Sequence, residues 1–370
     1  MSHAHAIAII GGSLAGLAAA RVLHAAGHRV TVFERAGADF ASRGGGLGVD
    51  LALATAVGGN PPPPHLRLPR RLLWRAGERW SEPAAEDVTA YGALWAWLAS
   101  GLPPDRLRHG AEVIEVRDGT DGVTLRLADG EVGEYTLALC ADGGRGAGRG
   151  WIEATPRPPT YAGYVLWRGL CPRAALAGPL AALAGLSINS LPDQHFVAYP
   201  IPTYAGDTAF DAQLINWGWY RPTPAAAAQV LLQGPSRVLV PHAFAEGPPP
   251  EAWRSELRAA LAPWPLEVRE LVEKTLTIGR VVPHPVHEVE PGRLARGRIA
   301  LVGDVAHQAS PITGAGARMA MSDALTLTAA LGADVDVTRA LERYGRQRQP
   351  DAAAVVVSGQ QAGRRFARFD

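Results

Sequence analysis

The chain has 370 residues and a formal net charge of +1, which is enough length for two domains with sizeable cores. The near-neutral charge excludes a strongly basic surface for nucleic acid or an anionic membrane. The two cysteines, Cys140 and Cys171, form neither a metal-binding spacing nor a disulfide framework. No apolar run approaches the roughly 20 residues that span a bilayer. Because the first apolar run begins by Ile7 without a preceding signal peptide, we expect a cytoplasmic protein.

A strand, a glycine-rich turn and a helix open the chain. The turn reads Gly11-x-Ser13-x-x-Gly16, and the next apolar run ends at Glu34. Small residues in such a turn let backbone amides approach a pyrophosphate at a helix N-terminus, and the acidic residue accepts hydrogen bonds from a ribose. The pattern predicts a dinucleotide-binding βαβ unit and leaves FAD and NAD both open. The plainer alternative is an ordinary strand, turn and helix.

A second cluster of glycines occupies residues 43–50. Glycines allow the backbone to approach a flat ligand closely, and Leu47 and Val49 add apolar surface. This favours a ligand-facing loop over the alternative of a flexible surface loop. The prolines at 61–64 then predict a stiff connection to a hairpin over residues 72–80.

Residues 90–142 predict a short helix followed by strands. The helix covers 90–99, and residues 111–116 and 122–127 alternate as antiparallel strands. A turn at Asp129-Gly130 leads into one further strand over 132–139, which runs on to Asp142-Gly143. This is the second place where a strand end meets a turn.

Residues 158–280 differ in character, because aromatic residues and alternating strands dominate them. We expect a mostly separate sheet domain, with helices over about 251–262 and 265–274. Aromatic residues in strands usually belong to a core, but their density here also suits the wall of an aromatic pocket.

A third turn follows the apolar run 298–302, which ends in Gly303-Asp304. The chain then passes through Pro311 and Gly314 into a helix that begins near Gly316. Free amides at such a helix N-terminus stabilise negative charge. Residues 338–370 look helical and close the chain.

Taken together, these three turns resemble the motifs of the FAD-dependent aromatic hydroxylases, the single-component flavoprotein monooxygenases. The first is Gly11–Gly16 with Glu34-Arg35, the second is Ala141–Gly143 with two arginines, and the third runs from Gly303 to Ala324. The resemblance covers nearly the whole chain. The segments 161–169, 196–202 and 216–220, together with Ser13, are similar to the 2,6-dihydroxypyridine 3-hydroxylase subgroup.

The resemblance implies an α/β fold in which a Rossmann-type βαβ FAD-binding domain joins a mostly antiparallel β-sheet substrate domain, as in p-hydroxybenzoate hydroxylase. The FAD-binding domain would comprise residues 1–64, 89–157 and 281–350, and the substrate domain residues 65–88 and 158–280. Residues 351–370 would form a C-terminal helix. The resemblance further implies bound FAD, NADPH or NADH as co-substrate, O₂ and a small aromatic or heteroaromatic substrate. It implies a monomer or homodimer without metal, nucleic acid or membrane.

The resemblance also assigns the residues that hold FAD. Those of the first motif lie along its pyrophosphate and adenosine: Gly11, Gly12, Ser13, Leu14, Ala15, Glu34 and Arg35. Those of the glycine loop approach its isoalloxazine or ribityl chain: Arg43, Gly45, Gly46 and Leu47. Asp142 belongs to the motif that supports both FAD and nicotinamide. Those of the third turn face the ribityl chain, the phosphates and the flavin ring: Gly303, Asp304, Pro311, Gly314, Gly316 and Ala317.

Four positions depart from the family pattern. Gly146 stands where serine is frequent, and Tyr91 stands where an arginine is expected. The last turn often reads Gly-Gln-Gly-Ala-Asn, whereas this chain has Ala315 and Arg318 at its second and fifth positions. These changes bear on side-chain contacts to the cofactor, whereas the backbone contacts need only small residues.

The family reaction implies that NADPH or NADH reduces FAD and that a flavin C4a-hydroperoxide, formed with O₂, hydroxylates an electron-rich ring. The substrate is activated by losing a proton, which a histidine or tyrosine takes or relays. His195 and Tyr199 lie four residues apart on one predicted strand and share a face. We expect Tyr199 to orient the substrate, His195 to be a candidate base and Pro311 to line the flavin. The alternative places Tyr199 in the core and His195 in solvent, and which of the two acts as base stays open.

Other expectations concern the rest of the pocket. Trp217 and Trp219 share a strand face, and one of them is expected to stack on the substrate. Since no second βαβ motif is present, nicotinamide is expected to bind in a groove near Asp142 and Arg43. His307 is expected to hold its turn.

Two other functions stay open on the sequence alone: another FAD enzyme of the same fold, such as a halogenase or reductase, and a non-catalytic flavin-binding protein. A halogenase is expected to have Trp-x-Trp-x-Ile-Pro, but Tyr220-Arg221 follow Trp219 here. The only lysine, Lys274, lies far from that segment in the chain. The sequence identifies neither the aromatic substrate nor the preference for NADH or NADPH.

Overall fold

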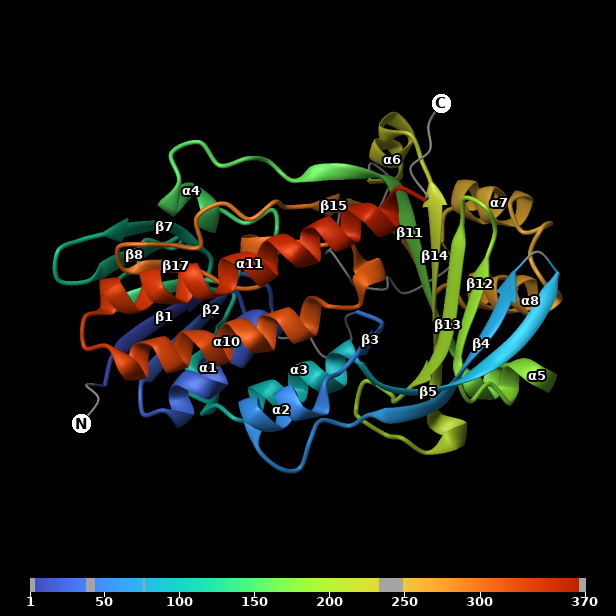
Figure 1. Cartoon of the computed structure of the whole chain (residues 1–370), viewed down its shortest axis with the longest axis horizontal. Helices are drawn as coiled ribbons and strands as arrows, with labels where there is room; N and C mark the ends of the chain where they lie inside the picture. Colours follow the sequence, from blue (N-terminus) through green and yellow to red (C-terminus); the bar gives the residue numbers. More distant parts are fainter. Residues whose placement is uncertain (1–3, 38–43, 76, 233–248, 366–370) are drawn as a thin grey trace.

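A computed structural model describes residues 4–37, 44–75, 77–232 and 249–365 of the chain. Two large β-sheets lie next to each other, each with its own hydrophobic core (Figure 1).

The first large sheet has six strands in the order β16-β17-β10-β1-β2-β6. All neighbouring pairs are parallel except β16 with β17. The central strands are apolar along their whole length because both faces of the sheet are covered. The strands are β1 (Ala6–Ile10), β2 (Arg29–Glu34), β6 (Leu107–His109), β10 (Leu137–Cys140), β16 (Ala295–Arg296) and β17 (Ile299–Leu301).

Helices cover one face of this sheet, and a small three-stranded sheet covers the other. The helices are α1 (Leu14–Ala25), α2 (Leu51–Gly58), α3 (Tyr91–Ala99), α10 (Gly316–Ala333) and α11 (Val337–Gly363). The small sheet comprises β7 (Val113–Asp118), β8 (Val123–Leu127) and β9 (Val132–Tyr135). Alternate residues of β1 point to opposite cores, with Ile7 and Ile9 towards the helices and Ala8 and Ile10 towards the small sheet.

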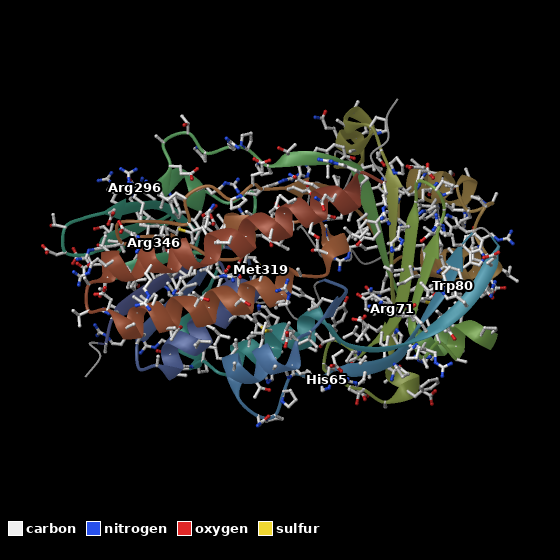
Figure 2. All side chains as sticks on the ribbon, in the orientation of Figure 1. His65, Arg71, Trp80, Arg296, Met319 and Arg346 are labelled. Carbon is white, nitrogen blue, oxygen red and sulfur yellow. The ribbon has the colours of Figure 1, made fainter. Side chains whose placement is uncertain are left out.

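The second large sheet has eight strands in the order β15-β11-β14-β13-β12-β4-β5-β3. Four helices are associated with its core: α5 (Gly178–Ala181), α6 (Ala225–Leu232), α7 (Glu251–Ala259) and α8 (Leu266–Ile278). The strands are β3 (Gly46–Gly48), β4 (Leu66–Arg75), β5 (Glu78–Ala90), β11 (Thr160–Pro172), β12 (Leu186–Ser190), β13 (His195–Ile201), β14 (Leu214–Pro222) and β15 (Val281–Glu288). Figure 2 shows Arg71 and Trp80 on this sheet, at the opposite end of the molecule from Arg296 and Arg346.

Two expected elements differ in the structure. The run predicted as one strand over 132–139 is two strands in different sheets, β9 beside β8 and β10 beside β1. The hairpin expected over 72–80 is longer, because β4 and β5 pair from Leu66 opposite Val88 to Arg75 opposite Glu78. The β propensity of residues cannot show where one strand ends and the next begins when a continuous apolar run contributes to two sheets.

Two expected domain limits also differ. Residues 281–288 form β15 and belong to the eight-stranded sheet, not to the first sheet as expected. No element boundary separates 281–350 from 351–370, because α11 continues through Pro350 to Gly363. Proline lacks an amide hydrogen and usually kinks or breaks a helix, but α11 continues past Pro350.

The remaining elements are short. They are α4 (Gly148–Ile152), α9 (Asp304–His307) and single 3₁₀ turns over Pro104–Arg106, Arg173–Ala175, Phe210–Ala212 and Pro311–Thr313. Within the described ranges, none of the helices is long and apolar enough to cross a membrane.

Candidate active site

The three predicted turns lie side by side at one edge of the six-stranded sheet. They follow β1, β10 and β17, which are parallel neighbours. The amide of Ala141 donates to the carbonyl of Ile10 at 2.7 Å, and the amide of Val302 donates to that of Cys140 at 2.9 Å. Turns that are about 300 residues apart in the chain therefore form one continuous surface, where the carboxyl ends of parallel strands meet.

The first turn brings β1 and α1 together through two glycines. Gly11 has φ +111°, and a Cβ there would lie 2.3 Å from the carbonyl oxygen of Ala141. A Cβ at Gly16 would lie 1.9 Å from the carbonyl oxygen of Gly11. Only glycine fits at either position, and the first amides of α1 are thereby placed at the open edge of the sheet.

Glu34 holds this turn from the end of β2. Its Oε2 accepts a hydrogen bond from the amide of Gly12 at 2.8 Å, and its Oε1 accepts one from the amide of Ala36 at 2.8 Å. The side chain is buried, whereas that of Arg35 is exposed. Each carboxylate oxygen can accept more than one hydrogen bond, so these two amides do not use all of the acceptor capacity of Glu34.

Ser13 and Tyr91 form a pair that the sequence did not connect. The two hydroxyl oxygens lie 2.7 Å apart, and Tyr91 begins α3. Tyr91 stands where the family has an arginine, and Ser13 stands at the second glycine position of the dinucleotide motif G-x-G-x-x-G. The tyrosine thus reaches the serine that replaces the second glycine of the motif.

Asp142 lies in the second turn with one oxygen satisfied and one not. The amide of Gly148 donates to Oδ2 at 3.0 Å, whereas buried Oδ1 has no hydrogen-bond partner among the described residues. Burial raises the pKa of this carboxyl. A Cβ at Gly146 would lie 2.1 Å from Cγ of Asp142, which accounts for glycine where serine is frequent.

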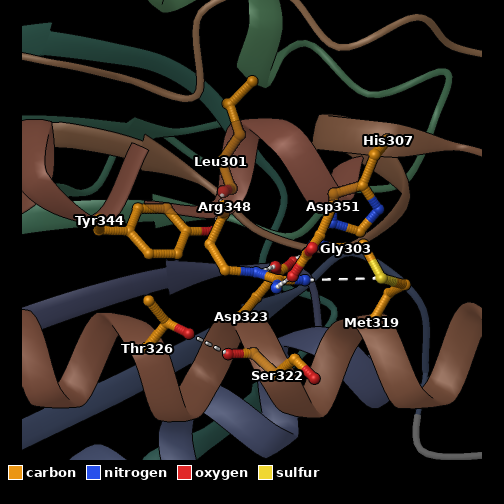
Figure 3. A network of polar contacts seen from close by, with 10 residues as sticks. All are labelled: Leu301, Gly303, His307, Met319, Ser322, Asp323, Thr326, Tyr344, Arg348 and Asp351. Carbon is orange, nitrogen blue, oxygen red and sulfur yellow. Dashed lines mark hydrogen bonds and ion pairs between the residues drawn. The ribbon is translucent and has the colours of Figure 1, made fainter. Parts of the chain in front are cut away.

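The third turn is fixed by a buried polar network around Asp323 of α10 (Figure 3). Its Oδ2 accepts hydrogen bonds from the amide of Gly303 and from Nε2 of His307, both at 2.8 Å. Its Oδ1 accepts one from Nε of Arg348 at 2.7 Å, and Arg348 also pairs with Asp351 at 2.6 Å. Burial opposes protonation of His307, but the hydrogen bond and the charge of Asp323 outweigh it and raise its pKa. The contacts of His307 suit the structural role expected for it.

Asp304 and the start of α10 face outward from this network. The Asp304 side chain is solvent-exposed, yet desolvation by surrounding protein raises the pKa of its carboxyl. A Cβ at Gly314 or Gly316 would meet no atom within 4 Å. No side chain caps α10, so its first amides remain available to a ligand.

The glycine loop lies against the eight-stranded sheet. The amide of Gly46 in β3 donates to Oδ1 of Asn216 at 2.8 Å, and the hydroxyl of Tyr204 donates to the carbonyl of Gly44 at 3.0 Å. A Cβ at Gly46 would lie 2.7 Å from the Tyr199 ring. Residues 44–48 are therefore packed in place, and Leu47 contacts the first core. Arg43, expected to contact FAD, lies outside the described residues.

His195 and Tyr199 share the face of β13 that is turned away from the helices, as expected. Burial and the nearby Arg365 lower the pKa of His195 to about 4, and its Nδ1 lies 3.2 Å from the hydroxyl of Ser190. Burial raises the pKa of Tyr199 to about 12, against the opposing charge of Arg168. At neutral pH both side chains are uncharged.

Trp217 and Trp219 are core residues, which corrects the expectation that one of them stacks on substrate. Both are fully buried on the helix-covered face. The indole N–H of Trp217 donates to Oγ1 of Thr275 at 3.0 Å, and that of Trp219 donates to Oε1 of Gln194 at 2.8 Å. The period of two places them opposite Tyr199 on the sheet.

Four residues at this face were not recognised as site candidates from the sequence. Three lie on its strands, Arg168, Asn216 and Tyr220, and Tyr204 lies in the turn after β13. Arg168 pairs with Gly218 of β14, and Asn216 pairs with Tyr199 of β13. A charged residue in the buried run 164–171 was the available signal, since charges are rarely buried without a partner. Among the described residues, no group of His, Cys, Asp and Glu is arranged to hold a metal ion.

Comparisons with known proteins bear on this arrangement. The family described as "FAD binding domain" matches residues 271–358, and that described as "NAD(P)-binding Rossmann-like domain" matches residues 9–62. A 3-amino-4-hydroxybenzoate 2-monooxygenase from Streptomyces platensis is 31% identical over 391 residues, covering 99% of this chain and 89% of the relative. A 2,6-dihydroxypyridine 3-monooxygenase from Paenarthrobacter nicotinovorans is 26% identical over 368 residues, covering 91% and 85%.

Solved structures share the fold. That of 2,6-dihydroxypyridine-3-hydroxylase from Arthrobacter nicotinovorans matches with a TM-score of 0.87 at 24% identity, covering 100% of this chain and 95% of the other. A salicylate hydroxylase substrate complex matches with a TM-score of 0.71 at 21% identity, covering 98% and 89%. The arrangement of a Rossmann-type unit beside a large sheet is thus common to them.

Proposed function

The chain belongs to the FAD-dependent aromatic monooxygenases, and from this premise we propose that it hydroxylates an electron-rich aromatic or hydroxypyridine ring held against the Tyr199 face of the eight-stranded sheet. As a member of this family it is an NAD(P)H-dependent flavoprotein. The reaction consumes a ring C–H, O₂, NAD(P)H and a proton, and yields a ring C–OH, NAD(P)⁺ and water. One relative acts by name on a hydroxybenzoate and another on a dihydroxypyridine, which supports this substrate class.

One observation carries the proposal: the glycine loop and the third turn contact residues on or next to the face of the eight-stranded sheet that carries Tyr199. Asn216 of that sheet and Tyr204 of the turn after β13 bind the glycine loop. The hydroxyl of Tyr164 lies 2.5 Å from that of Ser310, next to Pro311. Segments that would hold a dinucleotide are thereby joined to a pocket wall of tyrosines.

The residues present fit FAD. The uncapped start of α10 with open space at Gly314 and Gly316, the unsatisfied Oδ1 of Asp142 and the exposed Asp304 are what an elongated polar ligand requires. We assign the pyrophosphate to the amides of residues 12–15 and the ribose to Glu34. We assign the flavin end to residues 45–47, 303–304, 311 and 314–317. The chemistry that FAD supplies when bound is electron transfer from NAD(P)H and the use of O₂ as oxygen donor.

Tyr199 is the group that we assign to substrate orientation. No described residue forms a hydrogen bond with its hydroxyl, and its raised pKa keeps that hydroxyl protonated at neutral pH. It therefore donates to, or relays a proton from, a ring oxygen of the substrate. His195, with a pKa of about 4, is a weak base and acts as its neutral form.

The amides at the start of α10 are assigned an electrostatic role. Several N–H groups at a helix N-terminus stabilise negative charge that develops nearby. The eight-stranded sheet on the other side keeps water from the reacting ring. Nicotinamide is assigned to a surface near Asp142, whose turn borders the same edge of the first sheet.

The assay that tests the function uses the FAD-loaded protein with NADH or NADPH and a panel of phenols, hydroxybenzoates and hydroxypyridines. We expect at least one ring to stimulate NAD(P)H oxidation and to give a product heavier by one oxygen, labelled when ¹⁸O₂ is supplied. Oxidation without any oxygenated product across the panel would refute hydroxylation. In Tyr199→Phe we expect kcat to fall by about 10²-fold or more with FAD affinity unchanged, while Tyr135→Phe, far from this face, serves as the control.

We further propose a monomer or homodimer that works in the cytoplasm. Both cysteines, Cys140 and Cys171, are free and buried, which suits a reducing compartment. Light scattering after size-exclusion chromatography tests the oligomeric state.

A further inference from the structure

Helices leave a gap on the face of the eight-stranded sheet that they cover. A cavity of about 370 Å³ lies there, between strands β4, β5, β12 and β13 and helices α5 and α8. Its walls include Trp74 of β4, Phe196 of β13 and Leu180 of α5, and we call it the Trp74 cavity. Figure 1 shows α5 and α8 at the end of the molecule that is far from the six-stranded sheet.

The Trp74 cavity is separate from the proposed FAD and substrate sites. Phe196 and Ala198 of β13 line it, whereas His195 and Tyr199 of the same strand point to the opposite face of the sheet. Among the described residues, neither the three turns nor the glycine loop contributes to its lining. A ligand in this cavity would therefore lie behind the strand that carries Tyr199, with the sheet between it and the proposed FAD site.

The register of the strands makes one side of the cavity polar. Residues that lie opposite one another in paired strands share a face, and two such rows cross the sheet here. From β5 to β14 the first row is Ser81, Leu72, Ser187, Ala198 and Trp217, and the second is Arg79, Trp74, Asn189, Phe196 and Trp219. Both rows are apolar on β13 and β14 and contain polar residues on β12 and β5.

Asn189 contributes a hydrogen-bond acceptor to this mainly apolar lining. The residue is only 6% exposed, and its Nδ2 donates to Oγ of Ser187 at 3.0 Å. Its Oδ1 accepts no hydrogen bond from the part of the chain that the structure describes. A carbonyl oxygen that is buried without a donor costs folding free energy, so a donor supplied from outside the chain would stabilise the protein.

The charges at the rim of the cavity neutralise each other. Arg79 of β5 and Glu267 of α8 form a two-point ion pair, with N···O distances of 2.7 and 2.9 Å. This hydrogen bonding holds the pKa of Glu267 below its usual range, so both groups are charged at neutral pH. No other charged side chain of the described ranges lines the cavity. A charged ligand would therefore find no unpaired partner there.

We propose that the Trp74 cavity binds an uncharged aromatic molecule that carries an N–H or O–H donor. Cavities of this size, lined by apolar and aromatic side chains with a few polar groups, are typical of small-molecule sites. The aromatic walls favour a flat ring, the paired charges favour a neutral ligand, and Oδ1 of Asn189 favours one with a donor. The site does not depend on the hydroxylation proposed above.

Isothermal titration calorimetry of the FAD-loaded protein, without NAD(P)H, tests the proposal with indole, benzofuran and indole-3-carboxylate. Indole has a ring N–H, benzofuran has an oxygen there that cannot donate, and the carboxylate adds a charge. We expect indole to bind about threefold to tenfold more tightly than benzofuran, which corresponds to one hydrogen bond, and more tightly than the carboxylate. No binding of indole, or equal or tighter binding of either analogue, would overturn the proposal.

Two tryptophan substitutions in β5 locate the site. Ser81 is exposed and lines the cavity, so Ser81→Trp should fold and obstruct it, and the affinity for indole should fall by about tenfold or more. Ala85→Trp is the matched control, because Ala85 is exposed on the same strand and does not line the cavity, and it should bind indole as the wild type does. Unchanged affinity in Ser81→Trp would place the ligand elsewhere and refute the proposal.

Asn189→Leu tests the assigned acceptor with a side chain of similar size. Indole and benzofuran should bind this variant alike, and circular dichroism checks that it is folded. A folded variant that keeps the preference for indole would show that Asn189 is not the acceptor and that the assignment is wrong.

The flavin absorbance separates this cavity from the proposed active site. Indole in the Trp74 cavity should leave the flavin spectrum unchanged, because the sheet lies between them. A spectral change that follows the calorimetric binding curve would place indole against the Tyr199 face. That outcome would overturn the proposal and leave the proposed function standing, whereas failure of every hydroxylation assay would leave indole binding untouched.

Discussion

Glu288 is a buried carboxylate of β15. Its Oε1 has no hydrogen-bond partner within the described ranges, and it lines a cavity of about 220 Å³ with Tyr164, Gln360 and Arg364. Burial raises its pKa from the ordinary 4.5 to about 7, with a smaller contribution from Glu290. The protonated form is therefore favoured in the folded protein.

The stability of the protein should depend on pH through this residue. As pH rises from about 4.5 to 7, the folded state keeps a proton that the unfolded state has lost, so Glu288 lowers stability progressively. We expect Glu288→Gln to unfold at the same denaturant concentration as the wild type at pH 4. At pH 8 it should be more stable by about 1–3 kcal/mol.

Urea unfolding followed by fluorescence at several pH values measures this difference. Glu270→Gln, at an exposed position on α8, is the control. A constant difference between the Glu288 variant and the wild type across the pH range would contradict the assignment.

At the scale of elements, β3 joins the two halves of the molecule with only three residues. It pairs with β5, and its first residue is bound by Asn216 of β14. The two outer glycines of the strand have different surroundings. A Cβ at Gly46 would lie within 2.9 Å of Tyr199, Ile201 and Asn216, whereas a Cβ at Gly48 would meet only the Asp87 carbonyl oxygen at 4.0 Å.

The same substitution should therefore act differently at the two glycines. We expect Gly46→Ala to move β3 off the sheet and to lower kcat/KM by about tenfold or more, because misplaced reacting groups lose rate steeply. Gly48→Ala, its control in the same strand, should change kcat/KM little. Steady-state kinetics on the hydroxylated substrate measure both, and equal effects would show that Gly46 is not packed as described.

Helices α10 and α11 are held to the third turn by Asp323. Three donors converge on this fully buried carboxylate: the Gly303 amide, His307 and Arg348. The turn that carries Asp304 therefore depends on side chains from two later helices, and cutting the network should affect both folding and cofactor binding.

Replacing Asp323 by asparagine should destabilise the protein by about 3–5 kcal/mol, since Arg348 would be left as a buried charge with one acceptor lost. We expect the melting temperature to fall and FAD affinity to weaken together. Asp334→Asn removes a carboxylate that forms a surface ion pair with Arg339, and it should leave both unchanged. A normal melting temperature in Asp323→Asn would mean that the network does not stabilise the turn.

At the scale of the whole molecule, the proposed FAD site runs from the first turn to the second sheet. One end lies at Glu34 in β2, and the other lies where Ser310, next to Pro311, contacts Tyr164 of β11. A ligand that spans this distance should stabilise the native state through both halves of the chain.

Removal of FAD should therefore lower the melting temperature. At a free FAD concentration of 100 times its Kd, mass action stabilises the folded protein by about 2.7 kcal/mol. FMN lacks the adenosine that we assign to Glu34 and should stabilise the protein less at the same concentration. Thermal scans of the apoprotein with each flavin measure this, and equal shifts would contradict the placement of adenosine at the first turn.

Local patterns in the sequence were sufficient to predict much of this protein. The glycines at 11 and 16, the acidic Glu34 and the Gly-Asp strand end at 303–304 impose backbone geometry that few other residues permit, so the Rossmann-type unit and the family were recognisable from them. The alternation that placed His195 and Tyr199 on one face also holds, because the side-chain period of a strand is two.

The tertiary structure decided which face of each strand meets the site. The period of two shows that Trp217 and Trp219 share one face of their strand, but it does not show which face that is. The helices packed against them show that this face belongs to the core. Likewise, the split of 132–139 between two sheets depends on partners more than a hundred residues away in one case. Local sequence thus determined the turns and the strand periods. Long-range packing determined which side chains face the helix-covered core and which face the opposite side of the sheet, because burial depends on contacts that form only when distant segments meet.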